Sequence, residues 1–150
     1  YRRQRQMCIR DSVGSVDKIL TSELKKRIDK GFIPVIAPIG KSNEGHYLNI
    51  NADVVAGKVA QVLKAEKLIL LTDVKGIGDS DNKLISNITL KKGENLLKKK
   101  FIKGGMTPKL TSALEAKKRG VKSCHIIDGR VPHAVLLEVL TEEGVGTMIS

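Results

Sequence analysis

The chain has 150 residues, of which 41% are hydrophobic, and this composition suits a single globular domain with one hydrophobic core. No apolar run could span a membrane, and the basic first dozen residues lack the apolar stretch of a signal peptide, so we expect a cytoplasmic protein with no membrane partner. The net charge of +11 suits a polyanionic ligand, but only 3% of residues are aromatic and no helix-turn-helix or zinc-finger spacing occurs. Nucleic acid is therefore not an expected partner.

Residues 1–12 differ from the rest of the chain, because they carry four arginines, at positions 2, 3, 5 and 10, and show no apolar periodicity. The segment resembles a translated sequencing-adapter sequence, and the alternative is a disordered basic arm. In both interpretations it lies outside the folded domain, which we place at residues 13–150.

The first half of this domain alternates helical patterns with short apolar runs. In chain order, the patterns predict a helix at 23–30 that follows Ser22 and ends at Gly31, a buried strand at 32–37, a polar turn at 40–45, a strand at 46–50, a helix at 52–64 and a buried strand at 67–72.

The second half continues this alternation. The patterns predict a peripheral strand at 83–89, a lysine-rich helix at 91–100, a helix at 106–119, a buried strand at 121–127, a helix at 132–140 and a closing strand at 146–149. Thr107 suits the N-cap of the helix at 106–119, and Pro108 suits its first helical position.

Buried strands that alternate with helices predict an α/β fold, here a three-layer αβα sandwich with a mainly parallel sheet. Ligands of such sheets bind beyond the carboxyl ends of the strands. The residues that follow the strands at 32–37, 46–50 and 67–72 should therefore face the functional site.

Polar residues follow two of these strands. Asn49, Asn51 and Asp53 open a helix, where they can cap it or present amides and a carboxylate to a polar substrate. Asp73 begins a glycine-bearing loop, where it can accept hydrogen bonds from ribose hydroxyls or simply form a turn. The chain has no Walker-type phosphate loop.

The start of the helix at 106–119 is a third candidate site. Gly104 and Gly105 allow the backbone to approach a ligand, and free N–H groups at a helix start attract anions. Lys109 lies in the first turn, against the helix dipole, which suggests a compensating anionic ligand; the alternative is a merely exposed lysine.

The order of these segments resembles a known family. From about Val13 to Ser150 the chain is similar to the nucleotide-binding, C-terminal part of acetylglutamate kinases, within the amino-acid kinase superfamily. The matching stretches are 31–38, 49–53, 66–73, 104–109, 125–133 and 144–148. The last two favour acetylglutamate kinases over the aspartate, glutamate, carbamate and uridylate kinases of the superfamily.

The resemblance implies transfer of the γ-phosphoryl group of ATP, with Mg²⁺, to the γ-carboxylate of N-acetyl-L-glutamate in arginine biosynthesis. It implies that Asn49 contacts the substrate with Asn51 nearby, that Asp53 organises the catalytic lysines, and that Lys109 neutralises charge on the transferring group. The residues that it places around ATP are Thr72, Asp73, Val74, Lys75, Gly76, Ile77, Gly78, Phe101, Ile102, Lys103, Gly105 and Met106. It implies no protein side chain as a metal ligand.

The resemblance also implies that part of the machinery is absent. The N-terminal half of the family carries a second catalytic lysine, a Gly-Gly phosphate loop and an arginine that grips the substrate, and none can be placed before Val13. We therefore expect a fragment that is inactive alone, from a parent that forms a homo-oligomer, either a dimer or a hexamer.

Glu138 and Gly144 have the six-residue spacing of a Glu and a Gly that help to bind L-arginine in arginine-inhibited members of the family. The alternative is a plain helix end followed by a glycine stop. Two other functions also stay open: a related kinase that acts on an N-acetyl-aminoadipate-type or carrier-bound substrate, and a basic module that binds an anionic polymer through the lysines at 91–103.

Overall fold

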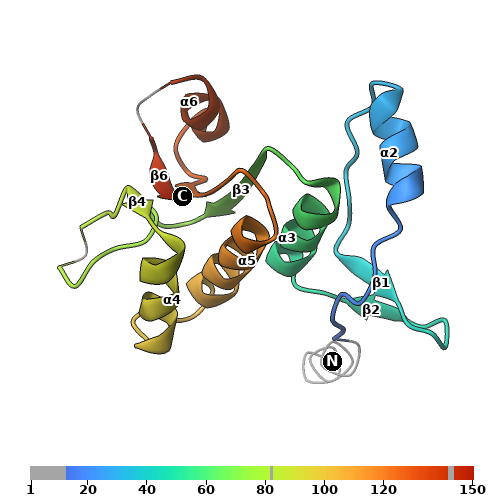
Figure 1. Ribbon diagram of the computed structural model, residues 1–150, viewed down its shortest axis with the longest axis horizontal. Coiled ribbons are helices and arrows are strands. Elements are labelled where there is room, and N and C mark those ends of the chain that lie inside the picture. The colour runs from blue at the N-terminus through green and yellow to red at the C-terminus, as the bar shows by residue number, and fades with distance from the viewer. Residues whose placement is uncertain (1–12, 82, 142–143) are drawn as a thin grey trace, which may run out of the picture.

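The computed structural model describes residues 13–81, 83–141 and 144–150. The first twelve residues, which were predicted to lie outside the folded domain, are not within this range. The described chain forms a four-stranded sheet with helices on both faces and a separate two-stranded hairpin (Figure 1).

The central sheet has the strand order β3-β5-β6-β4, formed by Lys67–Thr72, Ser123–Asp128, Gly146–Ile149 and Asn87–Ile88 respectively. β3 pairs with β5 and β4 with β6 in parallel, whereas β5 and β6 are antiparallel. The prediction of a mainly parallel sheet is thus confirmed, with one antiparallel pairing inside it. Because Thr72 pairs with Asp128, the carboxyl ends of β3 and β5 meet at one edge.

Helices α3 (Ala52–Leu63), α4 (Leu90–Lys98) and α5 (Met106–Lys118) lie on one side of the sheet, and α6 (Ala134–Leu140) lies on the other (Figure 1). The core lies where α5 packs on the sheet. It comprises fully buried apolar side chains of α5, β5 and β6, among them Leu110, Ala113, Ala116, Ile126 and Ile149.

Helices α3 and α5 pack closely at one glycine. A Cβ added at Gly57 would lie 3.2 Å from Cβ and 3.3 Å from the carbonyl oxygen of Ser112. Gly57 follows Asp53 by about one turn of α3, and Ser112 follows Lys109 by about one turn of α5. The close helix contact therefore brings the first turns of the two helices together.

The N-terminal part contains α2 (Thr21–Asp29) and the hairpin of β1 (Ile39–Lys41) and β2 (Tyr47–Asn49). The predicted helix and its stop at Gly31, where φ is +81°, are confirmed. The structure differs from the expected start after Ser22, because the helix begins at Thr21 without a side-chain cap.

The prediction of a buried strand at 32–37 is wrong. The described structure has no strand there, and Ile33 and Val35 are 92% and 98% exposed. A strand needs a neighbour to satisfy its backbone N–H and C=O groups, and no described strand pairs with this run. The polar turn expected at 40–45 is shorter than predicted, because β1 takes residues up to Lys41.

Two boundaries in the second half also differ. The strand expected at 83–89 is reduced to Asn87–Ile88, and the next helix begins at Leu90, where Oγ1 of Thr89 accepts a hydrogen bond from the Lys92 N–H. Helix α5 begins at Met106 rather than after a Thr107 cap. The Thr107 hydroxyl instead donates to the carbonyl of Ile102 at 3.3 Å. Pro108 is tolerated as the third helical residue, because the first-turn N–H groups have no partner within the helix.

No helix within the described ranges is long and apolar enough to cross a membrane.

Candidate functional site

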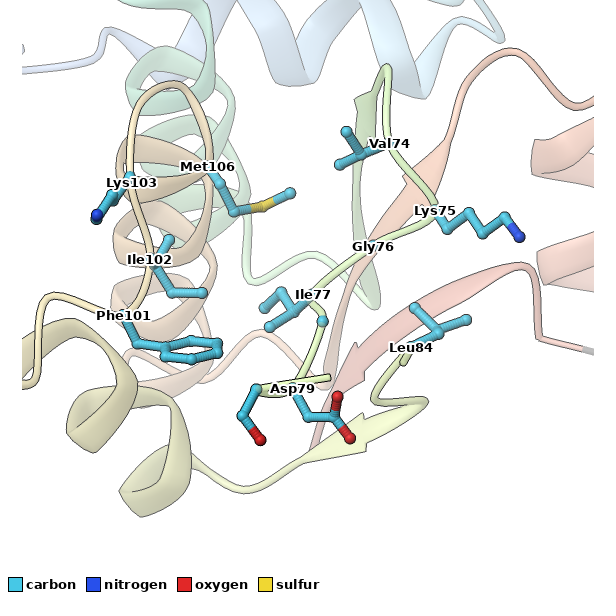
Figure 2. Close-up of a pocket in the computed structure, with 12 residues that line it drawn as sticks. Val74, Lys75, Gly76, Ile77, Asp79, Leu84, Phe101, Ile102, Lys103 and Met106 are labelled. Carbon is cyan, nitrogen blue, oxygen red and sulfur yellow. The ribbon is translucent and has the colours of Figure 1, made fainter. Parts of the chain in front are cut away.

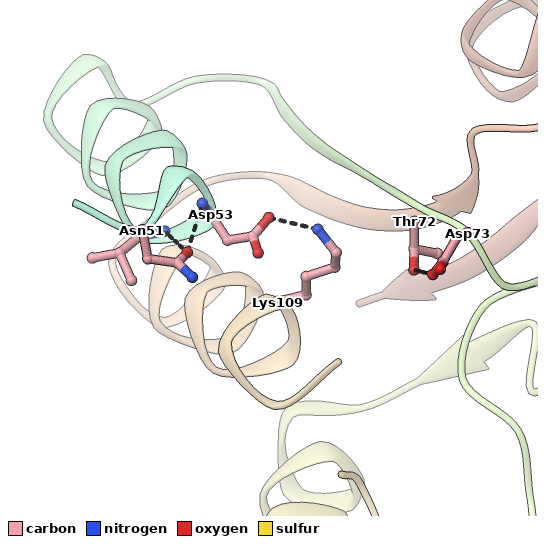
Figure 3. A network of polar contacts seen from close by, with 6 residues as sticks. Asn51, Asp53, Thr72, Asp73 and Lys109 are labelled. Atoms are coloured by element: carbon pink, nitrogen blue, oxygen red, sulfur yellow. Dashed lines mark hydrogen bonds and ion pairs between the residues drawn. The ribbon is translucent and has the colours of Figure 1, made fainter. Parts of the chain in front are cut away.

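An ion pair joins the starts of α3 and α5. The ammonium of Lys109 lies 2.8 Å from Oδ1 of Asp53, and their side chains are only 19% and 17% exposed (Figure 3). Partial burial weakens solvent screening, so the carboxylate holds the ammonium in a defined place. The structure thus brings together two predicted site residues that are 56 positions apart in the chain.

Asn51 fixes the carboxylate side of this pair. Its side-chain oxygen accepts hydrogen bonds from the N–H groups of Asp53, at 2.9 Å, and Val54, at 3.3 Å, so it is the N-cap of α3 (Figure 3). Asn49 ends β2 two residues earlier, opposite Ile39. The capping interpretation of Asn51 is therefore confirmed, and its side-chain N–H₂ group is the part left for a ligand.

A second group of charges lies at the carboxyl ends of β3 and β5. The Arg130 guanidinium donates to both carboxylate oxygens of Asp128, at 2.9 and 2.8 Å, and the Arg130 backbone N–H adds a third bond at 3.0 Å. These hydrogen bonds lower the pKa of Asp128 to about 2, with a smaller contribution from the charge of Lys75. The hydrogen bonds to Asp128 and its charge raise the pKa of Arg130, with a smaller contribution from the charge of Asp73.

Asp128 and Arg130 are not among the residues predicted for the site from the sequence. The strand-end rule could have found them, because Asp128 directly follows the predicted buried strand at 121–127.

A pocket of about 560 Å³ opens between the loop after β3 and the start of α5 (Figure 2). Its volume lies in the range of small-molecule sites. The apolar side chains of Ile77, Leu84, Phe101 and Met106 surround it, and Lys75 and Lys103 stand at its rim (Figure 2). An apolar slot with cations at its edge suits a flat heterocycle that carries negative groups.

The pocket contains nine of the twelve residues predicted around a nucleotide: Val74, Lys75, Gly76, Ile77, Gly78, Phe101, Ile102, Lys103 and Met106. Thr72, Asp73 and Gly105 adjoin these segments without lining the pocket; the Thr72 hydroxyl donates to Oδ1 of Asp73 at 3.4 Å. The lining residues that were not predicted are Asp79, Ser80 and Leu84. They belong to the same loop, which turns back so that Gly78 and Leu84 pair in an antiparallel β-bridge.

The pocket and the ion pair share one helix start. Met106 lines the pocket, and Lys109 follows it on α5 by three residues, almost one turn. A ligand held in the pocket can therefore extend along the start of α5 toward the Lys109 ammonium.

Glu138 and Gly144 lie elsewhere, beside β5 and β6. Oε1 of Glu138 lies 2.6 Å from Nδ1 of His125, and Oε2 accepts the N–H of Val145 at 2.9 Å. The side chains of His125 and Glu138 are almost fully buried, and Nε2 of the same histidine lies 3.0 Å from Oγ of Ser123. A Cβ at Gly144 would lie 3.8 Å from Oε2 of Glu138, so the structure does place this pair of predicted residues side by side.

The family model described as the amino acid kinase family matches residues 2–128. The chain belongs to the amino acid kinase family. Among curated relatives of this chain, proteins named acetylglutamate kinase from Nitrosomonas eutropha and Saccharophagus degradans are 55% and 54% identical over 137 and 138 residues. These alignments cover 91% and 92% of the chain but 46% of each relative, so the chain spans about half their length.

Solved structures share the fold of this chain. N-acetylglutamate synthase from Neisseria gonorrhoeae, complexed with coenzyme A and L-arginine, matches with a TM-score of 0.84 and 30% identity, over 93% of this chain and 32% of that one. The protein smu.665 from Streptococcus mutans matches with a TM-score of 0.78 and 34% identity, over 93% and 51% of the two chains.

Proposed function

We propose that this chain is the nucleotide-binding half of an enzyme that transfers the γ-phosphoryl group of ATP to the side-chain carboxylate of N-acetyl-L-glutamate. The observation that carries the proposal is the Lys109–Asp53 pair, 2.8 Å apart and less than one fifth exposed, at the helix start that also lines the pocket. The curated relatives at 55% and 54% identity, named acetylglutamate kinase, support the choice of substrate.

This reaction suits a site with lysines and no general base. A side-chain carboxylate has an unperturbed pKa of about 4.3, so it is already deprotonated at neutral pH. One carboxylate oxygen forms a bond to the γ-phosphorus, while the bond from phosphorus to the bridging oxygen breaks and ADP leaves with the electron pair. The barrier has two sources, because the two anions repel each other and must also be brought into line. A cation held in a fixed place lowers this barrier.

In this proposal Lys109 neutralises charge on the transferring group, and Asp53 holds the ammonium in place. Asn49 contacts the substrate, with the N–H₂ group of Asn51 nearby. The base and sugar of ATP occupy the pocket between the loop after β3 and residues 101–106, and Asp73 accepts hydrogen bonds from the ribose.

Mg²⁺ fits this arrangement as a partner of the phosphates. Among the described residues, no three His, Cys, Asp or Glu side chains gather into a metal site. Mg²⁺ usually keeps several waters and is held by one or two carboxylates together with substrate phosphates, so ATP and water would supply most of its ligands. When bound, it would offset charge on the phosphates.

We further propose that the parent works in arginine biosynthesis in the cytoplasm as a homo-oligomer, and that its other half supplies the remaining catalytic and substrate-gripping residues. This chain spans 46% of the length of the Nitrosomonas eutropha relative, which supports an active site divided between two parts.

A chimeric enzyme tests the proposed reaction. Residues 13–150 would replace the matching stretch of the Nitrosomonas eutropha relative, with which this chain shares 55% identity over 137 residues. We expect ATP-dependent formation of an acyl phosphate, trapped as its hydroxamate, within about tenfold of the turnover of the unaltered relative. N-acetyl-aminoadipate and free glutamate are the comparison substrates. A chimera that prefers either of them, or that folds and turns over none, would contradict the assignment.

A regulatory role is a separate proposal for Glu138 and Gly144, as contacts for L-arginine. A guanidinium there would compete with His125 and the Val145 N–H, which now occupy the two carboxylate oxygens of Glu138. We expect calorimetric titration of L-arginine into the chimera to give binding heat that Glu138→Gln removes. Absence of heat with the parent chimera would count against arginine control.

A further inference from the structure

One wall of the pocket is a loop whose backbone is held from two sides. Residues 74–80 form this wall, and Ile77 at its centre is 1% exposed (Figure 2). The carbonyl of Ile77 accepts a hydrogen bond from the Ile85 N–H at 2.8 Å. Its own N–H donates to Oγ1 of Thr147 at 2.9 Å, and the two residues are 70 positions apart in the chain. The second bond ties the loop to the central sheet.

The position of Thr147 is set by the sheet and not by the loop. The residue lies in β6, is fully buried and pairs with Ile126 of β5. At its neighbour Gly146, an added Cβ would lie 2.2 Å from the carbonyl oxygen of Ile126. β6 therefore lies too close to β5 for a side chain at Gly146. This close pairing fixes the backbone of the neighbouring Thr147, and with it the position of the Thr147 hydroxyl.

The loop also approaches Thr147 at a glycine. Gly76 has a φ of +138°, which side-chain-bearing residues rarely adopt. An added Cβ there would lie 2.8 Å from Oγ1 of Thr147 and 2.7 Å from Cδ1 of Leu84. The backbone of Gly76 and Ile77 is therefore in direct contact with this hydroxyl. The position of the hydroxyl thus determines the distance between this loop and the opposite wall of the pocket at Phe101 and Met106.

We propose that Thr147 is a positioning residue for nucleotide binding, which acts through the backbone of Gly76 and Ile77. The inference rests on the proposed function, because it takes the ligand of the pocket to be ATP. Thr147 does not line the pocket, so its effect on a ligand is indirect. Valine has nearly the shape of threonine but no acceptor, so Thr147→Val leaves the buried Ile77 N–H without its partner, and the loop must shift to find another. Serine keeps the oxygen.

The test is calorimetric titration of Mg-ATP into the chain and its variants. We expect Thr147→Val to weaken affinity about tenfold, which corresponds to about 1.4 kcal/mol, and Thr147→Ser to stay within about threefold of the parent. Thr89→Val is the matched control, because it removes a hydroxyl that caps α4. It should lower the melting temperature without changing affinity. In the chimera, Thr147→Val should raise KM for ATP and leave KM for N-acetyl-L-glutamate unchanged.

The outcomes separate this inference from the proposed function. If the unsubstituted chain does not bind Mg-ATP, or if Asp73→Ala binds it equally well, the nucleotide assignment is wrong and the role of Thr147 with it. If the unsubstituted chain binds Mg-ATP and Thr147→Val binds it equally well, only the role of Thr147 is wrong. Gly76→Ala disturbs the same contact from the loop side, and parent-like affinity in that variant would also overturn the inference, even if Thr147→Val does not fold.

Discussion

Replacing Lys109 by alanine in the chimera should reduce kcat about 10³-fold, the loss expected when a preorganised group that stabilises transition-state charge is removed. Lys109 is held 2.8 Å from Asp53 with a side chain that is 19% exposed, so in the proposed reaction its cation would need no reorganisation of a flexible side chain. KM for ATP should change little, because the pocket residues remain. The measurement is steady-state kinetics of hydroxamate formation.

The structure offers a matched control for this variant. Lys58 and Glu115 form another ion pair between α3 and α5, 3.8 Å apart, with side chains that are 34% and 50% exposed. Exposed pairs contribute little, so Lys58→Ala should leave kcat within about twofold and change the melting temperature only slightly. If Lys109→Ala keeps kcat within tenfold of the parent chimera, Lys109 does not act on the transferring group.

Elements with a complete local pattern were predicted well. The run at 67–72 and the run at 146–149 form β3 and β6 at the predicted residues, because each is an apolar segment that finds its partner within the chain. Helix α3 was also predicted almost to the residue, since Asn51 supplies the cap and Lys64 ends the helix in the left-handed region.

The run at 32–37 shows what such patterns omit. Its apolar, β-branched residues indicate burial, but they do not say which strand will cover them. In the described chain, Ile33 and Val35 remain exposed because no strand lies beside them. The start of α5 is a similar case, since Thr107 has a suitable side chain for a cap but its hydroxyl is engaged by the carbonyl of Ile102.

Prediction of the site was limited by contacts between distant residues. The strand-end rule pointed to Asp53, only the resemblance placed Lys109 with it, and the structure joins them. Thr147 had no local signal, because a lone threonine in a strand does not reveal that its hydroxyl holds a loop 70 residues earlier. Its role follows from the register of β6 against β5, which only the fold determines.

The chain of 150 residues should not phosphorylate N-acetyl-L-glutamate on its own. With saturating Mg-ATP and substrate, we expect hydroxamate formation at least about 10⁴-fold below that of the chimera. Removal of groups that act together in catalysis costs losses of this order or larger. The described residues supply one partly buried cation, Lys109, beside the pocket, whereas two anions must be brought into line. The resemblance places the second lysine and the substrate grip in a part that this chain, at 46% of its relatives' length, does not span.

The exposed apolar residues of the N-terminal part suggest how activity can be restored. Leu20, Ile33 and Val35 are 76%, 92% and 98% exposed, a surface that a neighbouring strand layer would cover. Adding the remaining part of the Nitrosomonas eutropha relative as a separate polypeptide should therefore recover measurable turnover, and Val35→Asp should reduce that recovery without affecting Mg-ATP binding. Turnover by the chain alone at the level of the chimera would show instead that a complete active site lies within these residues.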